Sequence, residues 1–201
     1  FFFKQKTAYE IRNCDWSSDV CSSDLTTRVS FIMRVPHSAM DGMPVGVMLY
    51  GHGLLGSNEE VRSSAVGTLA NSQRLIAVAA SLAGMNQEDV GSVFGALQDM
   101  TWFRGISERL HQGIIQWVLL ARSLRQRAST LTELSSRNVR VNPGEVYYAG
   151  NSQGGIFGGT FMAVTPDVTR GDLGVPGNNY NTLLHRSSDR KSTRLNSSHS
   201  S

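Results

Sequence analysis

The chain has 201 residues, with 19 Lys and Arg, 16 Asp and Glu and a formal net charge of +3. This length is sufficient for one domain with a buried core. No apolar run reaches the roughly 18 residues that a membrane-spanning helix needs, so a transmembrane protein is not predicted; association with a membrane by other means is left open. The Arg residues are scattered along the chain, which argues against a nucleic-acid-binding surface.

Both ends of the chain can be translated back into sequencing-adapter DNA. Residues Lys4–Ile11 and Cys14–Leu25 fit the codons of a sequencing-library adapter, and Asp189–His199 fits the reverse complement of that N-terminal adapter sequence. Two peptide ends encoded by opposite strands of one oligonucleotide indicate a library artefact. We therefore expect residues 1–25 and 189–201 to be translated adapter without a domain, and residues 26–188 to form a partial domain.

Removal of these ends changes what the composition indicates. Residues 26–188 contain 13 Arg, no Lys and 11 Asp or Glu, so this segment is close to neutral. Both cysteines, Cys14 and Cys21, lie in the N-terminal adapter segment, so no disulfide is predicted and no redox compartment follows. A signal peptide would lie upstream of residue 26; the sequence therefore leaves the localisation open, and a secreted or periplasmic bacterial protein is compatible with it.

The first half of this segment predicts three strands. Val29–Val35 alternates in hydrophobicity and is followed by Pro36, which cannot donate to a ladder, so an edge strand is expected. Val45–Tyr50 and Leu75–Leu82 are continuous apolar runs of the length typical of buried parallel strands. The helix between these two runs makes the order strand, helix, strand, which predicts a right-handed crossover.

The crossover helix is expected to begin at Ser57 and to end near residue 72. Ser57 and Glu60 have the spacing of a capping box, and three apolar residues recur on one helical face: Val61, Ala65 and Leu69. Residues 84–105 are either a lid over a site or a short helix packed on the body. Residues 106–127 have the periodicity of a long amphipathic helix, and residues 129–142 are expected to be a polar linker.

The segment around Ser152 carries the clearest chemical signal in the sequence. The β-formers Val146–Tyr148 lead into Gly150-Asn151-Ser152-Gln153-Gly154, and a helix pattern follows at residues 156–162. A serine on a sharp strand-to-helix turn projects its hydroxyl out of the sheet, and glycines two positions away on either side leave room for that turn. Ser152 is therefore a candidate nucleophile, and residues 171–175 are expected to begin one further strand.

A second glycine-rich segment, Gly51-His52-Gly53-Leu54-Leu55-Gly56, follows the strand Val45–Tyr50. Together the two motifs, each after a predicted buried strand, resemble those of the α/β-hydrolase family. The residue pattern of Gly51–Gly56 resembles that of bacterial lipases and esterases. The resemblance covers most of residues 26–175. It implies an α/β fold with a doubly wound, mostly parallel sheet, and a serine hydrolase that acts on small-molecule carboxylic esters or lipids.

The resemblance also implies roles for individual residues. Ser152 would be the nucleophile, and the backbone N–H groups of Leu54 and Gln153 would form the oxyanion hole. Four further residues would shape the site: His52, Gly53, Gly150 and Gly154. Other acyl-transfer chemistry on the same fold, by a peptidase or an acyltransferase, and a non-catalytic binding module are the alternatives.

The catalytic acid and base that the resemblance implies have few candidates in the sequence. After Ser152, residues 26–188 contain only Asp167, Asp172 and His185 as candidates, and His185, the candidate base, has no strand leading into it. The family fold needs well over 200 residues, so we expect a truncated and inactive fragment of an enzyme. No cofactor is predicted, because residues 26–188 have no Cys, dispersed His and no phosphate-binding P-loop motif, which also argues against a metal.

Overall fold

The computed structural model describes residues 2–9 and 27–177, and within them one sheet of six strands in the order β1-β2-β4-β3-β5-β6. The strands are β1 Phe2–Tyr9, β2 Thr27–Arg34, β3 Pro44–Gly51, β4 Leu75–Ala80, β5 Arg140–Asn151 and β6 Gly171–Gly174. The four strands β3 to β6 run parallel, whereas β2 is antiparallel to β4 and β1 is antiparallel to β2. The mostly parallel sheet expected from the sequence is confirmed.

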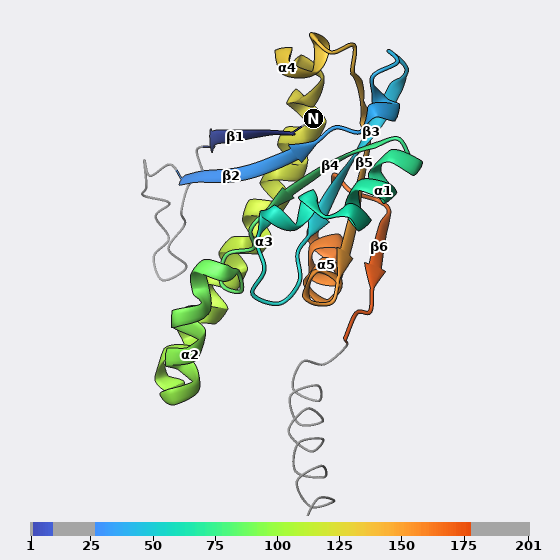
Figure 1. Ribbon diagram of the computed structural model, residues 1–201. Coiled ribbons are helices and arrows are strands. Elements are labelled where there is room, and N and C mark those ends of the chain that lie inside the picture. Colours follow the sequence, from blue (N-terminus) through green and yellow to red (C-terminus); the bar gives the residue numbers. More distant parts are fainter. Residues whose placement is uncertain (1, 10–26, 178–201) are drawn as a thin grey trace, which may run out of the picture.

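Helices cover both faces of this sheet, as Figure 1 shows. The α-helices are α1 Ser64–Ser72, α2 Val90–Gln98, α3 Phe103–Arg127, α4 Thr132–Ser135 and α5 Gln153–Val164. The 3-10 helices are η1 His37–Ala39, η2 Asn58–Arg62, η3 Gln87–Asp89, η4 Met100–Trp102 and η5 Ala128–Thr130. The doubly wound α/β class is thereby confirmed. In the described residues no helix combines the length and the apolar character that crossing a bilayer requires.

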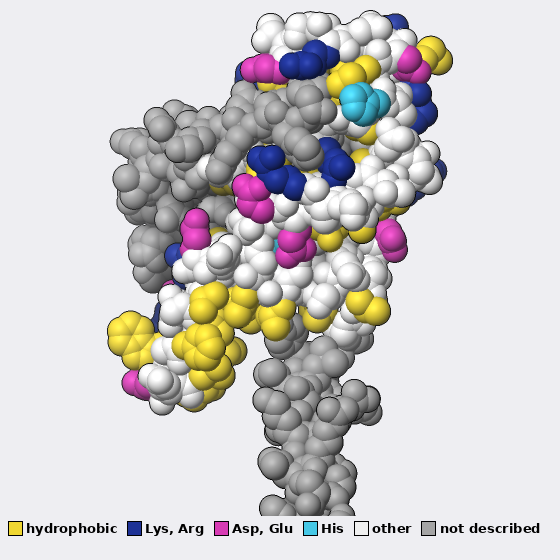
Figure 2. Space-filling model, in the orientation of Figure 1, with side chains coloured by type: hydrophobic (Ala, Val, Ile, Leu, Met, Phe, Trp, Pro, Cys, Tyr) yellow, Lys and Arg dark blue, Asp and Glu magenta, His cyan; other side chains and the backbone are white. Residues whose placement is uncertain are grey.

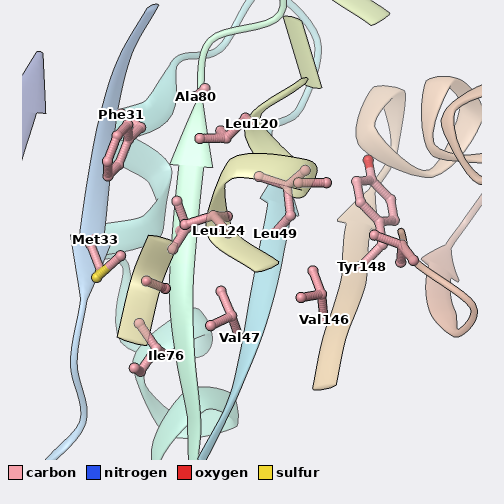
Figure 3. Packing of buried hydrophobic residues seen from close by; sticks show 14 of the residues in the cluster. Phe31, Met33, Val47, Leu49, Ile76, Ala80, Leu120, Leu124, Val146 and Tyr148 are labelled. Carbon is pink, nitrogen blue, oxygen red and sulfur yellow. The ribbon is translucent and has the colours of Figure 1, made fainter. Parts of the chain in front are cut away.

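The two faces of the sheet bury alternate residues of each strand, because successive side chains of a strand point to opposite sides. On the face covered by α3 and α5, Val47 and Leu49 of β3 are buried in one cluster (Figure 3) with other side chains from the strands and from α3. On the face covered by η2 and α1, the intervening Met48 packs in a second cluster with Val66 and Ala70. The crossover connections thus give the sheet two cores.

Three aromatic rings fix the position of β5 under its helices. The ring of Tyr148 in β5 lies 5.8 Å from that of Trp117 in α3 and 5.1 Å from that of Phe161 in α5, centroid to centroid. Trp117 donates from Nε1 to the Ala80 carbonyl oxygen, and the Tyr148 hydroxyl donates to the Gly154 carbonyl oxygen at 2.6 Å. Burial raises the pKa of Tyr148, so its hydroxyl stays protonated as a donor.

The buried strands, the long helix and the first strand occur where the sequence predicts them, but the first strand, β2, is not at an edge of the sheet. β2 pairs with β4 on one side and with β1 on the other. The edge prediction is therefore wrong, because Pro36 lies beyond the paired residues of β2 and removes no donor from either ladder. Residues 2–9, which back-translation attributes to adapter, form the outer strand β1.

The predicted helix from Ser57 to residue 72 is two elements, η2 and α1, with a break at Ser63. The guanidinium group of Arg34 donates to the carbonyl oxygens of Val61 and Ser63, at 3.1 and 2.6 Å. These contacts hold the chain at the break, where Ser63 is extended and caps α1. The break resets the helical phase, so the predicted apolar stripe is wrong.

The consequence of the break appears in burial and in capping. Val66 and Ala70 are buried, whereas Ala65 and Leu69 of the predicted stripe are exposed. Ser57 does cap the first turn, since its hydroxyl accepts from the Glu59 amide at 3.3 Å. The predicted capping box is incomplete, because the Glu60 carboxylate accepts from the Gly53 amide and not from the Ser57 amide.

Two other segments test the sequence predictions: the short-helix alternative is confirmed for residues 84–105, whereas the predicted polar linker at residues 129–142 is wrong. Residues 84–105, predicted as either a lid or a short helix, contain η3, the short helix α2 and η4, and α2 packs against α3. Residues 129–142 contain η5, α4 and the beginning of β5 in place of an irregular linker. Strand β5 accommodates Pro143 and Gly144 at a register shift relative to β3, where a proline is tolerated.

Two adjacent glycines of α5 provide a matched test of how tightly this helix packs on β5. A Cβ at Gly158 would collide with the Tyr148 ring and lie 2.8 Å from Leu173 Cδ2, whereas a Cβ at Gly159 meets nothing closer than 4.0 Å. We expect Gly159→Ala to raise the free energy of unfolding by about 0.5–1 kcal/mol, through helix propensity, and Gly158→Ala to lower it by about 1–3 kcal/mol through overpacking.

Denaturant unfolding followed by circular dichroism measures both variants against the parent chain. Equal effects of the two substitutions would contradict the close packing of Gly158 on Tyr148. Because both changes remove a glycine from the same turn of α5, their helix-propensity terms are the same and cancel in the comparison.

Candidate active site

The candidate residues lie at the carboxyl edge of the parallel strands. Gly51 at the end of β3 is the register partner of Gly150 in β5. The loop that follows β3 and the turn that follows β5 therefore leave the sheet side by side. In Figure 1 the arrow of β6 points down, and the parallel β3, β4 and β5 place this edge on the same lower side.

Ser152 occupies a strained turn between β5 and α5. Its backbone has φ 57° and ψ −117°, a conformation that costs a non-glycine residue of order 1–3 kcal/mol. The Ser152 amide donates to the Gly174 carbonyl oxygen at 3.0 Å, which anchors the turn to β6. The Ser152 side chain is exposed, and its hydroxyl has no hydrogen-bond partner among the described residues.

The glycines on either side of Ser152 are required by close backbone contacts. A Cβ at Gly150 would lie 2.5 Å from the Gly154 carbonyl oxygen, and a Cβ at Gly154 would collide with the Gly51 carbonyl oxygen. The latter contact brings α5 directly against the end of β3. The sequence interpretation that these glycines permit a tight turn agrees with this geometry, which puts residues 51 and 154 in contact.

The loop after β3 is held from one side by Glu60. The Gly53 amide donates to both carboxylate oxygens of Glu60, at 3.1 and 3.0 Å. A Cβ at Gly56 would collide with the same carboxylate, so the loop closes tightly around it. The Gly56 amide donates to the Gly53 carbonyl oxygen at 3.1 Å, which completes a compact turn over residues 53–56.

Gln153 holds this loop from the other side. Its side chain is 1% exposed, its Oε1 accepts from the Leu55 amide at 3.2 Å, and its Nε2 donates to the Met85 carbonyl oxygen at 3.0 Å. The residue next to the candidate nucleophile thus joins two loops that are far apart in sequence. This side-chain role was not predicted, because only the backbone N–H of Gln153 entered the sequence interpretation.

The Leu54 amide is left between these two anchors. Within the described parts of the chain neither the Leu54 N–H nor the Gln153 N–H has a hydrogen-bond acceptor. Gln153 is also the first residue of α5, and the N-terminus of a helix favours negative charge. The structure therefore leaves two amide donors without an acceptor among the described residues, one in the loop after β3 and one at the turn that follows Ser152.

His52 is buried and fully engaged by the backbone. The Leu82 amide donates to His52 Nε2 at 2.8 Å, which places the imidazole proton on Nδ1, where it donates to the Gly53 carbonyl oxygen at 2.8 Å. Burial lowers the pKa of His52, in keeping with this neutral form. With both ring nitrogens in use, His52 has none available to accept a proton from Ser152.

The loop after β4 completes the surroundings of the site. The Gln87 amide donates to the Gly56 carbonyl oxygen at 2.9 Å, so this loop packs directly on the β3 loop. The buried carboxylate of Asp89 accepts from the amides of Gly84 and Asn86, at 2.7 and 3.1 Å, and forms an ion pair with Arg109 of α3. Asn86 and Asp89 form a capping box over η3. Their spacing is a sequence signal that could have predicted the hydrogen bond between the Asn86 amide and the Asp89 carboxylate.

The acidic residues after Ser152 are not close to it in a catalytic arrangement. Asp167 pairs with Arg122 and lies in a surface pocket with Pro143. Pro143 lies toward the opposite end of β5 from Ser152, and Asp167 follows the far end of α5, whose 12 residues span about 18 Å at ~1.5 Å per residue. Asp172 lies within β6 as the register partner of Ala149, not in a loop after that strand. His185 lies outside the described residues.

An apolar surface projects from the same edge. Five side chains of α2, η4 and the start of α3 are between 54% and 71% exposed: Phe94, Leu97, Met100, Trp102 and Phe103. Figure 2 shows hydrophobic side chains gathered over α2 at the lower left.

The described residues contain no group of three His, Cys, Asp or Glu side chains that could hold a metal ion.

Comparisons with known proteins bear on the fold. No family model matches the chain, and no curated protein matches it. An arylesterase structure superposes with a TM-score of 0.56 and 13% identity, over 92% of this chain and 49% of the other. A putative dienelactone hydrolase from Klebsiella pneumoniae superposes with a TM-score of 0.52 and 13% identity, over 90% of this chain and 64% of that structure.

An α/β hydrolase enzyme from the metagenome of Lake Arreo superposes with a TM-score of 0.53 and 14% identity, over 89% of this chain and 45% of that structure. At such identities the likeness concerns the fold alone. The chain has the α/β-hydrolase fold, as its sequence resemblance implies, and it spans less than two thirds of the length of each of these three structures.

The buried neutral His52 predicts a pH dependence of stability. The pKa of His52 in the folded chain lies below the ordinary value of about 6.5, so the unfolded chain takes up the proton first as the pH falls. The contribution of His52 to the free energy of unfolding is complete above about pH 6.5 and is lost as the pH falls from there through the folded pKa.

We expect His52→Gln, whose side-chain oxygen can replace Nε2 as the acceptor for Leu82, to reduce this loss of stability. Urea unfolding at pH 7.5, 6.5 and 5.5 measures it: the parent chain should lose more free energy of unfolding over this range than the variant. Parallel losses in the two proteins would show that His52 does not carry the effect.

Proposed function

We propose that the chain carries the nucleophile and the oxyanion hole of a serine hydrolase that acts on carboxylic esters. The observation that carries this proposal is the exposed Ser152 on a strained turn, followed by the unpaired Gln153 amide. It is supported by the unpaired Leu54 amide, in the loop whose Leu55 amide donates to Gln153 Oε1. The α/β-hydrolase fold supports it. An arylesterase is among the structures that share this fold, and its substrate class is the one we propose.

The proposed chemistry is acyl transfer. Ser152 Oγ attacks the ester carbonyl carbon while a base accepts the hydroxyl proton, and negative charge develops on the carbonyl oxygen. The Leu54 and Gln153 amides donate to that oxygen, and each such donor typically contributes about a hundred- to a thousandfold in rate. The alcohol leaves with a proton, and water then releases the acid from Ser152.

The proposed substrate is a small-molecule ester or a lipid. The apolar side chains of α2 and η4 at the carboxyl edge, Phe94 and Trp102 among them, favour an ester with a hydrophobic acyl chain. Because an exposed apolar surface beside a site disfavours charged substrates, we expect neutral esters to react better than charged ones.

We further propose that this chain is only part of the enzyme, with translated adapter at residues 1–25 and 189–201. His52 is engaged by the backbone, and Asp167 lies beyond the far end of α5 from Ser152. The acid and the base that activate Ser152 would therefore come from segments encoded downstream in the parent gene.

The assay that tests this function uses p-nitrophenyl butyrate. We expect no hydrolysis by the purified chain above that of its Ser152→Ala variant. We expect the protein encoded by the complete parent gene to hydrolyse this ester, with a loss of about 10³-fold or more in kcat on Ser152→Ala. Ser152-dependent hydrolysis by the chain itself would contradict the missing base, and an inactive complete protein would contradict the hydrolase assignment.

The oxyanion hole can be tested in the chain itself by Ser152→Cys. Two amide donors and the N-terminus of α5 stabilise a thiolate there, so the thiol pKa should fall below the ordinary value of about 8.5. Thr160→Cys is the matched control, because Thr160 is exposed on the same helix away from its N-terminus. Iodoacetamide labelling at several pH values, read by peptide mass spectrometry, separates these thiols from Cys14 and Cys21. Equal pKa values at both positions would contradict the proposed site.

A further inference from the structure

We propose that the side chains of Gln153 and Glu60 are positioning residues. They clamp the loop after β3 so that the Leu54 amide, the one of residues 53–56 without an acceptor among the described residues, faces Ser152. This inference rests on the proposed oxyanion hole and assigns it two residues outside the reacting groups. It extends the role of Gln153 from its backbone N–H to its side chain.

Three of the four backbone amides of residues 53–56 have a hydrogen-bond acceptor. The Gly53 amide is taken by Glu60, and the Leu55 amide is taken by Gln153 Oε1. The Gly56 amide is taken by the Gly53 carbonyl oxygen. Among the amides of residues 53–56, that of Leu54 is the one without an acceptor in the described structure, so the two side chains select which amide is available.

The amide that donates to Gln153 belongs to a residue with an unusual backbone conformation. Leu55 has φ 52°, in the left-handed region that leucine rarely adopts. Such a conformation persists where surrounding contacts over-determine it, and the Leu55 amide bond to Gln153 is one such contact. The peptide between Leu54 and Leu55 is thus oriented by a side chain that comes from the turn carrying Ser152.

Gln153 is suited to this role because its own position is fixed. Its side chain is buried, and its Nε2 is bonded to the Met85 carbonyl oxygen. The loop that contains Met85 is in turn held by the buried carboxylate of Asp89, which accepts from the Gly84 and Asn86 amides. A rigid partner on one side of Gln153 makes the bond to Leu55 on its other side an effective constraint.

The test measures the pKa of the thiol that Ser152→Cys introduces, in chains that carry a second substitution. Gln153→Met keeps the size and the backbone N–H but removes both side-chain hydrogen bonds without a change of charge. We expect the pKa of this thiol to rise, with about tenfold less thiolate for each pKa unit of increase. The thiol that Thr160→Cys introduces should keep its pKa when Gln153→Met is added, which controls for a general effect on α5.

At Glu60 the loss of charge and the loss of positioning predict opposite changes in the pKa of the thiol, so two variants can separate them. Loss of a negative charge near the site should by itself lower the thiol pKa. If Glu60 positions the loop, Glu60→Ala should raise the pKa of the thiol at position 152 despite that loss. Glu60→Gln, whose carbonyl oxygen can still accept from Gly53, should not raise it. A lower pKa in both variants would overturn the role of Glu60.

Amide hydrogen exchange tests the clamp independently of the proposed function. In the Gln153→Met chain we expect the Leu55 amide to exchange about tenfold faster or more, with the Leu82 amide, bonded to His52, as the internal reference. Unchanged exchange at Leu55 would overturn the clamp even if the thiol at position 152 has a lowered pKa. An ordinary thiol pKa at position 152, together with faster exchange at Leu55, would instead contradict the hydrolase proposal and retain the clamp. Circular dichroism checks that each variant is folded.

Discussion

The close approach of two backbone segments, at the ends of β3 and β5, is the constraint on which the candidate site depends. Gly51 and Gly150 are register partners, and the absence of a side chain at Gly154 lets α5 begin against the Gly51 carbonyl oxygen. Any larger residue at position 154 would separate the turn at Ser152 from the loop after β3. The proximity of the turn at Ser152 to the end of β3 is therefore a consequence of backbone packing.

Packing on the α3 and α5 face keeps this approach in place. Tyr148 packs against both Trp117 and Phe161 and donates to the Gly154 carbonyl oxygen in the first turn of α5. Because that bond joins the core to the beginning of the helix, the strain at Ser152 is supported by buried contacts. The loops after β3 and β4 then add their own hydrogen bonds, through His52 and Gln153.

The same arrangement explains why the chain is an incomplete catalyst in our proposal. A nucleophile and amide donors come from strands that the described sheet contains, and they are fixed by contacts within it. A base has to come from a loop at the same edge, and the described acidic residues after Ser152 lie elsewhere: Asp167 near Arg122 and Asp172 within β6. The apolar surface over α2 lies at the carboxyl edge, where such a loop and a substrate would meet.

The sequence by itself determined the α/β class, the buried strands, the long helix and the motifs around His52 and Ser152, because periodicity, β-propensity and glycine spacing are local properties. Tertiary structure decided the rest: the break at Ser63 depends on Arg34, and β2 is internal because β1 pairs with it. Tertiary structure also gave Glu60 and Gln153 their partners. The contacts of Arg34 and Gln153 join residues distant in sequence, and no local pattern predicts which amides Glu60 and Gln153 accept from.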